Sequence, residues 1–169
     1  MIRSLLLCLV LTASLSVTAQ PCVDVSKTPE GKKMLVGFIT RAMIFQDTAF
    51  HEFAENGKWF TPQAPDVDAL KAKVDSVHFI VIFGTWCHDS QNLIPQFYKW
   101  IDAAEFPERR ITIIAVDKQK KAQGNFSQAF GIKSTPTFIV MRNGVEAGRV
   151  VEYGKSGNMV AELAEIVRK

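Results

Sequence analysis

One cysteine in this chain stands where helix geometry favours nucleophilic chemistry. Cys87 is the second residue of the segment WCHDS (residues 86–90), which follows a nearly continuous apolar run at residues 78–83 and opens a stretch with helical spacing. The unpaired N–H groups and the dipole of a helix's first turn stabilise a negative charge. A cysteine at such a position typically has a lowered pKa and reacts as the thiolate. We therefore predict that Cys87 is a nucleophile.

The residues that follow Cys87 act on its ionisation in opposite directions. A protonated His88 favours the thiolate, whereas Asp89 opposes it electrostatically, although an acidic side chain suits a helix N-terminus. The sequence leaves the sign of the net effect open. We expect no metal at this motif, because adjacent side chains on a helix fan out at about 100° per residue and cannot converge on one ion. An inert core cysteine is the structural alternative, since free cysteine is often buried.

Hydrophobic periodicity predicts the elements that must hold Cys87 in place. Continuous β-favouring runs are typical of buried strands, and apolar residues every three or four positions are typical of helices. Asn143-Gly144 between two such runs is the strongest short hairpin signal. From residue 78 onward we predict strand 78–83, helix 87–104 with Pro95 inside it, strand 111–116, helix 125–130, strands 137–142 and 145–151, and helix 156–168.

This order of elements predicts an α/β fold. Strand–helix–strand connections imply a parallel pair of strands, and the hairpin implies antiparallel neighbours. The expected result is a mixed central sheet flanked by helices on both faces.

The first half of the chain has a different pattern. Residues 29–55 carry apolar side chains at helical spacing after a Thr28-Pro29 start signal, so we predict one long helix or two shorter ones there. A loop and a short helix at 66–74, capped by Asp66, follow. We therefore divide the domain at 29–169 into a helical N-terminal extension, 29–75, and a core, 76–169. The aromatic residues of the extension either pack on the sheet or present an apolar surface to a partner protein; the set is Phe45, Phe50, Phe53, Trp59 and Phe60.

The N-terminal residues are typical of an export signal. Residues 1–19 combine an early Arg3, a short apolar run and a small residue at the end, so we predict a signal peptide cleaved between Ala19 and Gln20, followed by a polar tether at 20–28. The apolar run is too short to span a bilayer comfortably. We expect a periplasmic or secreted protein with no integral membrane span after cleavage. Neither Cys8 nor Cys22 stands in a favourable context for lipid attachment.

Composition excludes some classes of function. The 169 residues are 47% hydrophobic and 22% charged with net charge +3, which is ordinary for one globular domain. No block of Lys and Arg indicates a nucleic-acid partner, and we expect no cofactor. Export would leave Cys22 and Cys87 in the mature chain. Two cysteines are too few for a disulfide scaffold, so at least one is better explained by reactivity.

Two motifs in this order resemble the thioredoxin family. Residues 79–95, with their WCxxS core and the proline in the helix, resemble the strand and active-site helix of that family. Residues 131–138, GIKSTPTF, ahead of Asn143-Gly144, resemble the segment that carries a cis-proline across the substrate groove. The resemblance covers roughly residues 70–169 and implies a thioredoxin fold.

Carried over residue by residue, the resemblance gives each motif a role. Cys87 matches the attacking cysteine, and Trp86 matches the tryptophan that flanks it. Pro136 matches the cis-proline, and Thr135 matches the residue whose backbone pairs with a bound peptide. A cis X-Pro bond is a costly minority state, so strand-like docking of a substrate would be its reason.

The sequence departs from the family at two positions. Ser90 stands where dithiol members have their resolving cysteine. Val81 stands six residues before Cys87, where thioredoxins carry a buried acid that helps to deprotonate the resolving thiol. The chain therefore resembles a monothiol WCxxS variant and not an ordinary thioredoxin reductant.

The resemblance implies a thiol–disulfide oxidoreductase, reductase- or isomerase-like, that acts on disulfides or thiols of exported proteins. With one active-site thiol, a mixed disulfide must be resolved from elsewhere. The candidates for this resolving thiol are a second thiol of the client, a low-molecular-weight thiol and Cys22. The tether that carries Cys22 would reach about 30 Å if extended at 3.3–3.6 Å per residue. The alternative function is a non-catalytic peptide-binding module of thioredoxin fold, which Ser90 and Val81 favour.

Overall fold

The computed structural model describes residues 23–169, which are built on a mixed sheet of six strands. The strands lie in the order β1-β2-β4-β3-β5-β6. β3 pairs with β4 in parallel, and all the other neighbouring strands are antiparallel. The mixed sheet predicted from the sequence is thus confirmed. The strands are β1 (Val23–Lys27), β2 (Lys33–Phe38), β3 (Val77–Phe83), β4 (Ile111–Ala115), β5 (Thr137–Arg142) and β6 (Val145–Val151).

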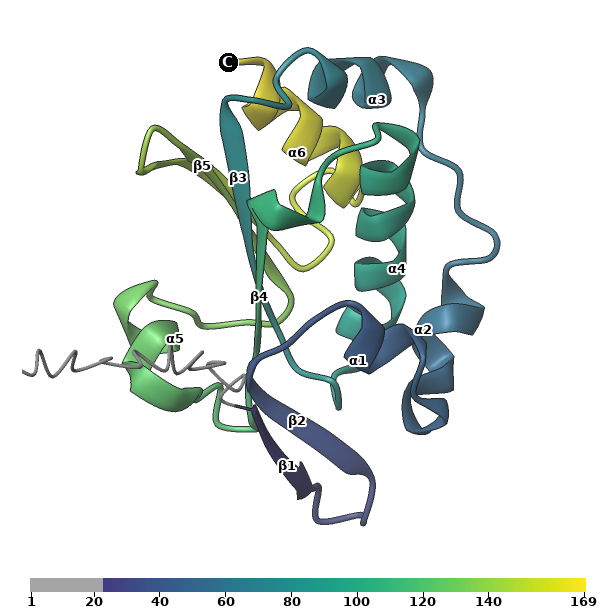
Figure 1. The fold of residues 1–169 in the computed structure, drawn as a ribbon, viewed down its shortest axis with the longest axis vertical. Coiled ribbons are helices and arrows are strands. Elements are labelled where there is room, and N and C mark those ends of the chain that lie inside the picture. The colour runs from purple at the N-terminus through teal and green to yellow at the C-terminus, as the bar shows by residue number, and fades with distance from the viewer. Residues whose placement is uncertain (1–22) are drawn as a thin grey trace, which may run out of the picture.

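Helices lie on both faces of the sheet, as Figure 1 shows: α1–α4 and α6 on one face, α5 on the other. Buried apolar residues accordingly form two clusters. The larger, which includes Phe79, Phe97 and Trp100, lies under the first group of helices, and the smaller, which includes Ile82 and Ile139, lies toward α5. The helices are α1 (Ala42–Phe45), α2 (His51–Asn56), α3 (Ala64–Lys71), α4 (His88–Ala103), α5 (Phe126–Ala129) and α6 (Met159–Arg168).

The predicted elements of the C-terminal half are confirmed. β5 and β6 span the predicted residues, and Asn143 and Gly144 between them adopt the positive φ values that a tight hairpin turn requires. α4 starts one residue after Cys87 and contains Pro95. α5 and α6 are both shorter than predicted. α6 begins only after its cap residue Asn158, whose side chain accepts a hydrogen bond from the N–H of Ala161.

The predictions for residues 20–55 are wrong over much of their length. Residues 23–27 form β1 instead of a free tether, and residues 33–38 form β2 instead of helix. The apolar residues of β2 also fit a strand, because Leu35 and Gly37, two apart, are both buried. The turn between β1 and β2 passes through Gly31 at φ 83°, so the Thr28-Pro29 signal marks a hairpin and not a helix start.

The remaining helical extension is shorter than predicted. Helical structure begins at Ala42 and is divided into α1, a 3₁₀ turn and α2. α3 begins at Ala64 with Pro65 in its first turn, so Asp66 is not its cap. Asp66 instead pairs with Arg168 of α6 at 3.0 Å.

The aromatic residues of the extension mostly pack inward. Phe50 and Phe53 are buried, and Phe45 and Phe60 pack against the main cluster. Trp59 alone of the five is exposed, at 93% of its surface. Of the two alternatives for these aromatic residues, inward packing is therefore correct for four of the five.

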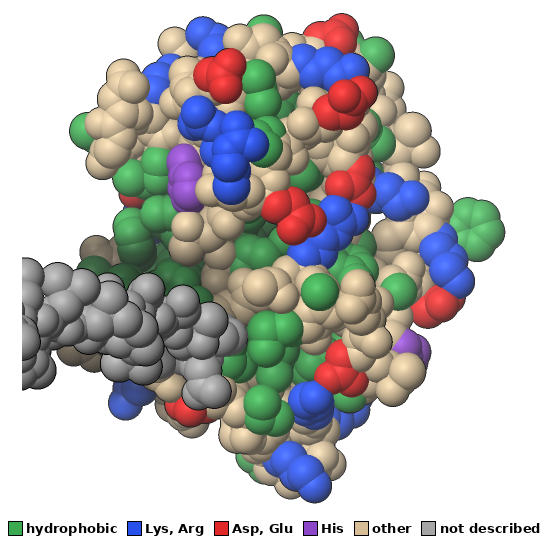
Figure 2. All heavy atoms as spheres, in the orientation of Figure 1, with side chains coloured by type: hydrophobic (Ala, Val, Ile, Leu, Met, Phe, Trp, Pro, Cys, Tyr) green, Lys and Arg blue, Asp and Glu red, His purple; other side chains and the backbone are tan. Residues whose placement is uncertain are grey.

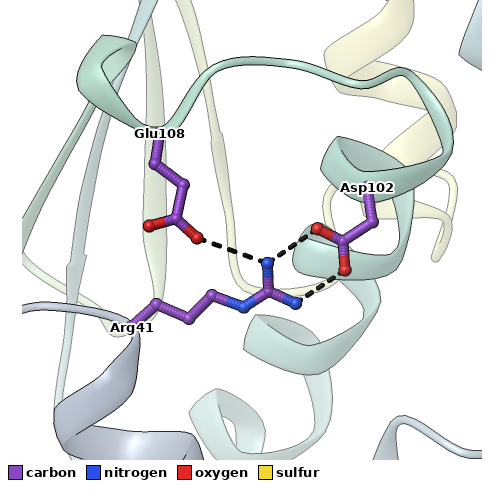
Figure 3. Close-up of polar contacts among 3 residues, drawn as sticks. All are labelled: Arg41, Asp102 and Glu108. Carbon is purple, nitrogen blue, oxygen red and sulfur yellow. Dashed lines mark hydrogen bonds and ion pairs between the residues drawn. The ribbon is translucent and has the colours of Figure 1, made fainter.

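A partly exposed ion cluster links the extension to the core (Figure 3). Arg41, beside α1, makes two hydrogen bonds to the carboxylate of Asp102 in α4, of 2.7 and 2.6 Å, and a longer one of 3.4 Å to Glu108. Its guanidinium lies 4.5 Å from the ring centroid of Tyr98. Burial raises the pKa of Tyr98 well above its usual range, so its hydroxyl stays protonated.

Charges are mixed over the face seen in Figure 2. Lys and Arg alternate there with Asp and Glu, and no patch of one sign gathers over any element. Within residues 23–169, no helix has the length and apolar character needed to cross a bilayer.

Candidate active site

Cys87 lies at the N-terminal end of α4, between that helix and the loop before β5. It is the N-cap residue, with extended backbone (φ −86°, ψ 125°), and its side chain is half-buried. Its Sγ–H donates a hydrogen bond of 3.2 Å to the carbonyl oxygen of Thr135. The peptide bond from Thr135 to Pro136 is cis. The sulfur therefore lies beside both the first turn of a 16-residue helix and the Thr135-Pro136 segment.

The loop between β3 and α4 is shaped by contacts of Trp86. Its indole Nε1–H donates to the carbonyl of Val116 at 2.9 Å, and Cys87 N–H donates to the carbonyl of Gly84 at 3.0 Å. The indole lies so close to Gly84 that a Cβ there would come within 2.5 Å of the ring. Residue 84 must therefore be glycine for the indole of Trp86 to approach the backbone this closely. The position of this indole fixes the direction in which the chain enters α4.

The two positions that depart from the family pattern are both buried. Val81, in β3, is 1% exposed and packs in the main apolar cluster. Ser90, in the first turn of α4, is 0% exposed, and its hydroxyl has no hydrogen-bond partner.

A polar network borders the site on the side of α2. His88 lies 3.2 Å from the side-chain amide of Asn92, which donates to the Tyr153 hydroxyl at 3.3 Å and accepts from Asn56 at 2.9 Å. Tyr153 follows β6 and is 38% exposed. The sequence analysis missed Asn56, Asn92 and Tyr153. Only the spacing of four residues between His88 and Asn92 could have indicated one of these contacts.

A cleft of about 370 Å³ lies between the β1–β2 turn, the start of α2 and the residues that flank Cys87. Trp86 and His88 line it together with Glu30 and Lys118. Glu30 and Lys118 form an ion pair of 2.9 Å, and hydrogen bonds, first from Lys118 and then from Thr28, lower the pKa of Glu30 to about 2. The hairpin that the sequence analysis took for tether and helix therefore forms one wall beside the site.

The structure brings together most of the predicted site residues. The hydrogen bond from Cys87 to Thr135 joins the two motifs, so Trp86 and Pro136, their neighbours along the chain, lie close to the same point, and His88, Asp89 and Ser90 form the first turn of α4. No group of three His, Cys, Asp or Glu side chains within residues 23–169 is arranged to hold a metal.

The possible resolving residue Cys22 lies outside the described residues. Val23, which follows it, is already paired with Gly37 in the sheet. Residues 23–27 of the predicted tether are therefore held in β1 and are not free to move with Cys22, whose role as a resolving residue stays a prediction.

Known proteins resemble this chain in sequence and in structure. A thioredoxin from Echinococcus granulosus is 28% identical over 94 residues, which are 54% of this chain and 82% of that protein. An HIV epitope-scaffold protein of known structure has a TM-score of 0.51 at 15% identity, covering 75% of this chain and 89% of its own, which supports the fold alone. A reduced thioredoxin pre-protein from Schistosoma mansoni gives 0.41 at 20% identity, covering 64% and 92%. The family model described as "Thioredoxin" matches residues 43–167, and the chain therefore belongs to the thioredoxin family.

Proposed function

We propose that this protein is a monothiol thiol–disulfide oxidoreductase that acts through Cys87 on disulfides or thiols of exported proteins. The observation that carries the proposal is the position of Cys87, half-buried at the N-cap of α4 with its sulfur 3.2 Å from the Thr135 carbonyl. Family membership supports protein thiols as the substrate class. Trp86 and Pro136 border the sulfur, and Thr135 offers its backbone to an extended client peptide.

The first chemical step is attack of the Cys87 thiolate on one sulfur of a client disulfide. The client S–S bond breaks, its second sulfur leaves as a thiolate, and a mixed disulfide joins Cys87 to the client. Ser90 supplies no thiol, so the second step needs another one. If the client's own thiolate attacks, a rearranged client disulfide forms with no net redox change, and Cys87 is regenerated.

A low-molecular-weight thiol gives the reductive outcome instead. One such thiol attacks the Cys87 sulfur and releases the client thiol, and a second regenerates Cys87. Overall, two small thiols become one disulfide and the client disulfide becomes two thiols. Cys22 is a third possible resolver, and a Cys22→Ser variant tests it: an unchanged lifetime of the mixed disulfide contradicts that role.

Export is part of the proposal. The pattern of residues 1–19 supports cleavage after Ala19 and a periplasmic or secreted product. N-terminal sequencing of the mature protein should begin at Gln20.

The reactivity of Cys87 tests the function. In a Cys22→Ser background, alkylation at pH 7 should be faster in the folded protein than in urea, although folding half-buries the sulfur. Equal or slower alkylation in the folded protein would contradict the enzyme.

A non-catalytic peptide-binding module is the second candidate, and the buried Ser90 and Val81 favour it because neither can take part in resolving a disulfide. Capture of an exported client joined to Cys87 by a disulfide, absent in Cys87→Ser, would rule out this candidate.

A further inference from the structure

The polar network beside Cys87 has a direction, which one backbone carbonyl group fixes. The side-chain nitrogen of Asn56 lies 3.2 Å from the carbonyl oxygen of Gln91, and this oxygen can only accept a hydrogen bond. Asn56 therefore presents its Nδ2 donor, which also lies 2.9 Å from the Oδ1 acceptor of Asn92. Reversing the Asn56 amide would bring two acceptors together, and reversing the Asn92 amide would bring two donors together. The hydrogen bonds thus fix the orientation of both amides.

The orientation of Asn92 decides the roles of its two other partners. Its Nδ2 group carries two protons and lies 3.2 Å from His88 Nε2 and 3.3 Å from the hydroxyl oxygen of Tyr153. Since an amide nitrogen only donates, His88 Nε2 accepts, and the single proton of the neutral imidazole is on Nδ1. The Tyr153 oxygen also accepts, so its own O–H points away from Asn92. Asn92 thus turns two groups that could donate or accept into outward donors.

Both donors lie at the surface on either side of the reactive sulfur. His88 is exposed and directly follows Cys87. Tyr153 is 38% exposed. The N–H of Glu152, its neighbour in the chain, donates to the carbonyl of Pro136 at 2.8 Å, which places Tyr153 next to the cis-proline segment. A client attached to Cys87 would therefore meet both donors.

Outward donors recognise an acceptor. A donor that a bound client covers without pairing it costs free energy, and a carbonyl oxygen can pair with it whereas a methyl or ammonium group cannot. In the proposed function, the backbone of an extended client pairs with Thr135. The side chains beside the client's cysteine are therefore the groups that remain to meet the donors of His88 and Tyr153.

We propose that Asn92 holds His88 and Tyr153 as donors for a side-chain carbonyl oxygen, and that the protein prefers clients with asparagine or glutamine beside the reactive cysteine. The inference rests on the proposed function, because it concerns clients that react with Cys87. Asp89 and Glu152, which adjoin the two donors in the chain, are acidic. A neutral amide oxygen therefore fits this surface better than a carboxylate does.

The test compares two activated peptides in a Cys22→Ser background at pH 8. The peptide cysteine carries a small aromatic thiol in disulfide linkage and is flanked on both sides by asparagine in one peptide and by leucine in the other. The Cys87 thiolate attacks the peptide's sulfur and the aromatic thiolate leaves, so its absorbance follows the formation of the mixed disulfide. The measured quantity is the rate with the asparagine peptide divided by the rate with the leucine peptide, because changes in the reactivity of the thiol itself cancel in this ratio.

Asn92→Asp keeps the shape of the side chain but can only accept at pH 8, so it draws His88 Nε2–H and the Tyr153 O–H inward. We expect the ratio of rates to fall about three- to tenfold, the effect of losing hydrogen bonds of ordinary strength. Tyr153→Phe removes one donor and keeps the ring, so it should lower the ratio by a smaller factor. Gln96→Glu, one turn further along α4, adds the same charge outside the network and should leave the ratio unchanged.

Nitrogen NMR of histidine-labelled protein gives a second readout, which a merely structural role of Asn92 would not move. The ring proton of His88, assigned with a His88→Gln variant, should be mainly on Nδ1 in the unsubstituted protein and on Nε2 in Asn92→Asp. An equal ratio of rates in these two proteins, or a His88 proton mainly on Nε2 before substitution, would overturn the inference. Failure of the proposed function is seen separately, as reaction with both peptides that is no faster in the folded protein than in urea.

Discussion

At the scale of single residues, the direction of the Cys87 side chain depends on the contact between Trp86 and Gly84. The indole lies over the bare Cα of Gly84 and is anchored by its hydrogen bond to Val116. A methyl group at residue 84 would occupy the place of the ring. The chain between β3 and α4 would then enter the helix differently.

Gly84→Ala should therefore destabilise the protein by about 1–3 kcal/mol and slow alkylation of Cys87, because the ring must move. Urea unfolding and alkylation kinetics measure the two effects. In a Trp86→Ala background the same substitution should cost much less, since the clash is gone. An equal cost in both backgrounds would show that the ring is not the obstacle.

A substitution at position 90 tests the proposed monothiol mechanism. Ser90→Cys would place a thiol three residues after Cys87, at the position of the resolving cysteine in dithiol relatives. We expect the variant to form an internal disulfide and to accumulate severalfold less mixed disulfide with a small disulfide-bonded peptide, measured by mass spectrometry. Ser127→Cys, in α5, is the control for an added thiol. Unchanged accumulation in Ser90→Cys would mean that residue 90 is out of reach of the sulfur.

The site residues that could be predicted from the sequence are those that belong to a short, recognisable motif. Cys87, Trp86, Thr135 and Pro136 lie in two short motifs, and the structure brings them together. Asn92, by contrast, gains its place in the site from contacts with Asn56 and Tyr153, far away in the chain. Such polar contacts leave no periodic pattern in a sequence, so only the fold reveals them.

At the scale of elements, the β1–β2 hairpin is tied to the active-site loop by one buried hydrogen bond. Leu35 N–H donates to the hydroxyl of Thr85 at 3.2 Å, and both residues are 2% exposed. Thr85 directly precedes Trp86, so the hairpin supports the loop that positions Cys87. The hairpin turn also forms one wall of the cleft beside the site.

Thr85→Val keeps the shape of this side chain but removes the acceptor and leaves Leu35 N–H buried without a partner. We expect a loss of about 1–3 kcal/mol in the free energy of unfolding. Thr85→Ser, which keeps the hydroxyl, should lose less. Hydrogen exchange at Leu35 checks the cause, because its amide should exchange faster in the valine variant alone. Equal protection in the two variants would contradict the role of this bond.

The elements also show where hydrophobic periodicity is ambiguous. The predicted bounds of β5 and β6 agree with the structure, and the turn dipeptide fixes where β5 ends and β6 begins. In β2 and just after it, the apolar residues at 34, 35, 38 and 39 match a helical repeat as well as a strand. The choice is made by pairing with β1 and β4, which is a long-range contact.

At the scale of the whole molecule, the sheet separates two unequal layers. The larger apolar cluster lies between the sheet and the layer that contains α4 and α6. The opposite face of the sheet is covered mainly by the segment around α5. Partly buried polar groups therefore remain on the second face. His78 of β3 is one of them, with Nε2 2.8 Å from Thr112 Oγ1.

His78 makes the stability of the protein depend on pH. Desolvation, with a smaller effect from the charge of Arg110, lowers the pKa of His78 below its usual value of about 6.5. As the pH falls below 6.5, the unfolded chain therefore binds the proton before the folded protein does. The contribution of His78 to the free energy of unfolding therefore decreases with falling pH until the folded-state histidine also titrates.

His78→Gln removes this proton binding from both states. Urea titrations at pH 7 and pH 5 should show a smaller loss of stability in His78→Gln than in the unsubstituted protein. An equal loss in both proteins would mean that His78 is as easily protonated in the fold as in the unfolded chain, and that the second face of the sheet is more open to water than its packing against α5 implies.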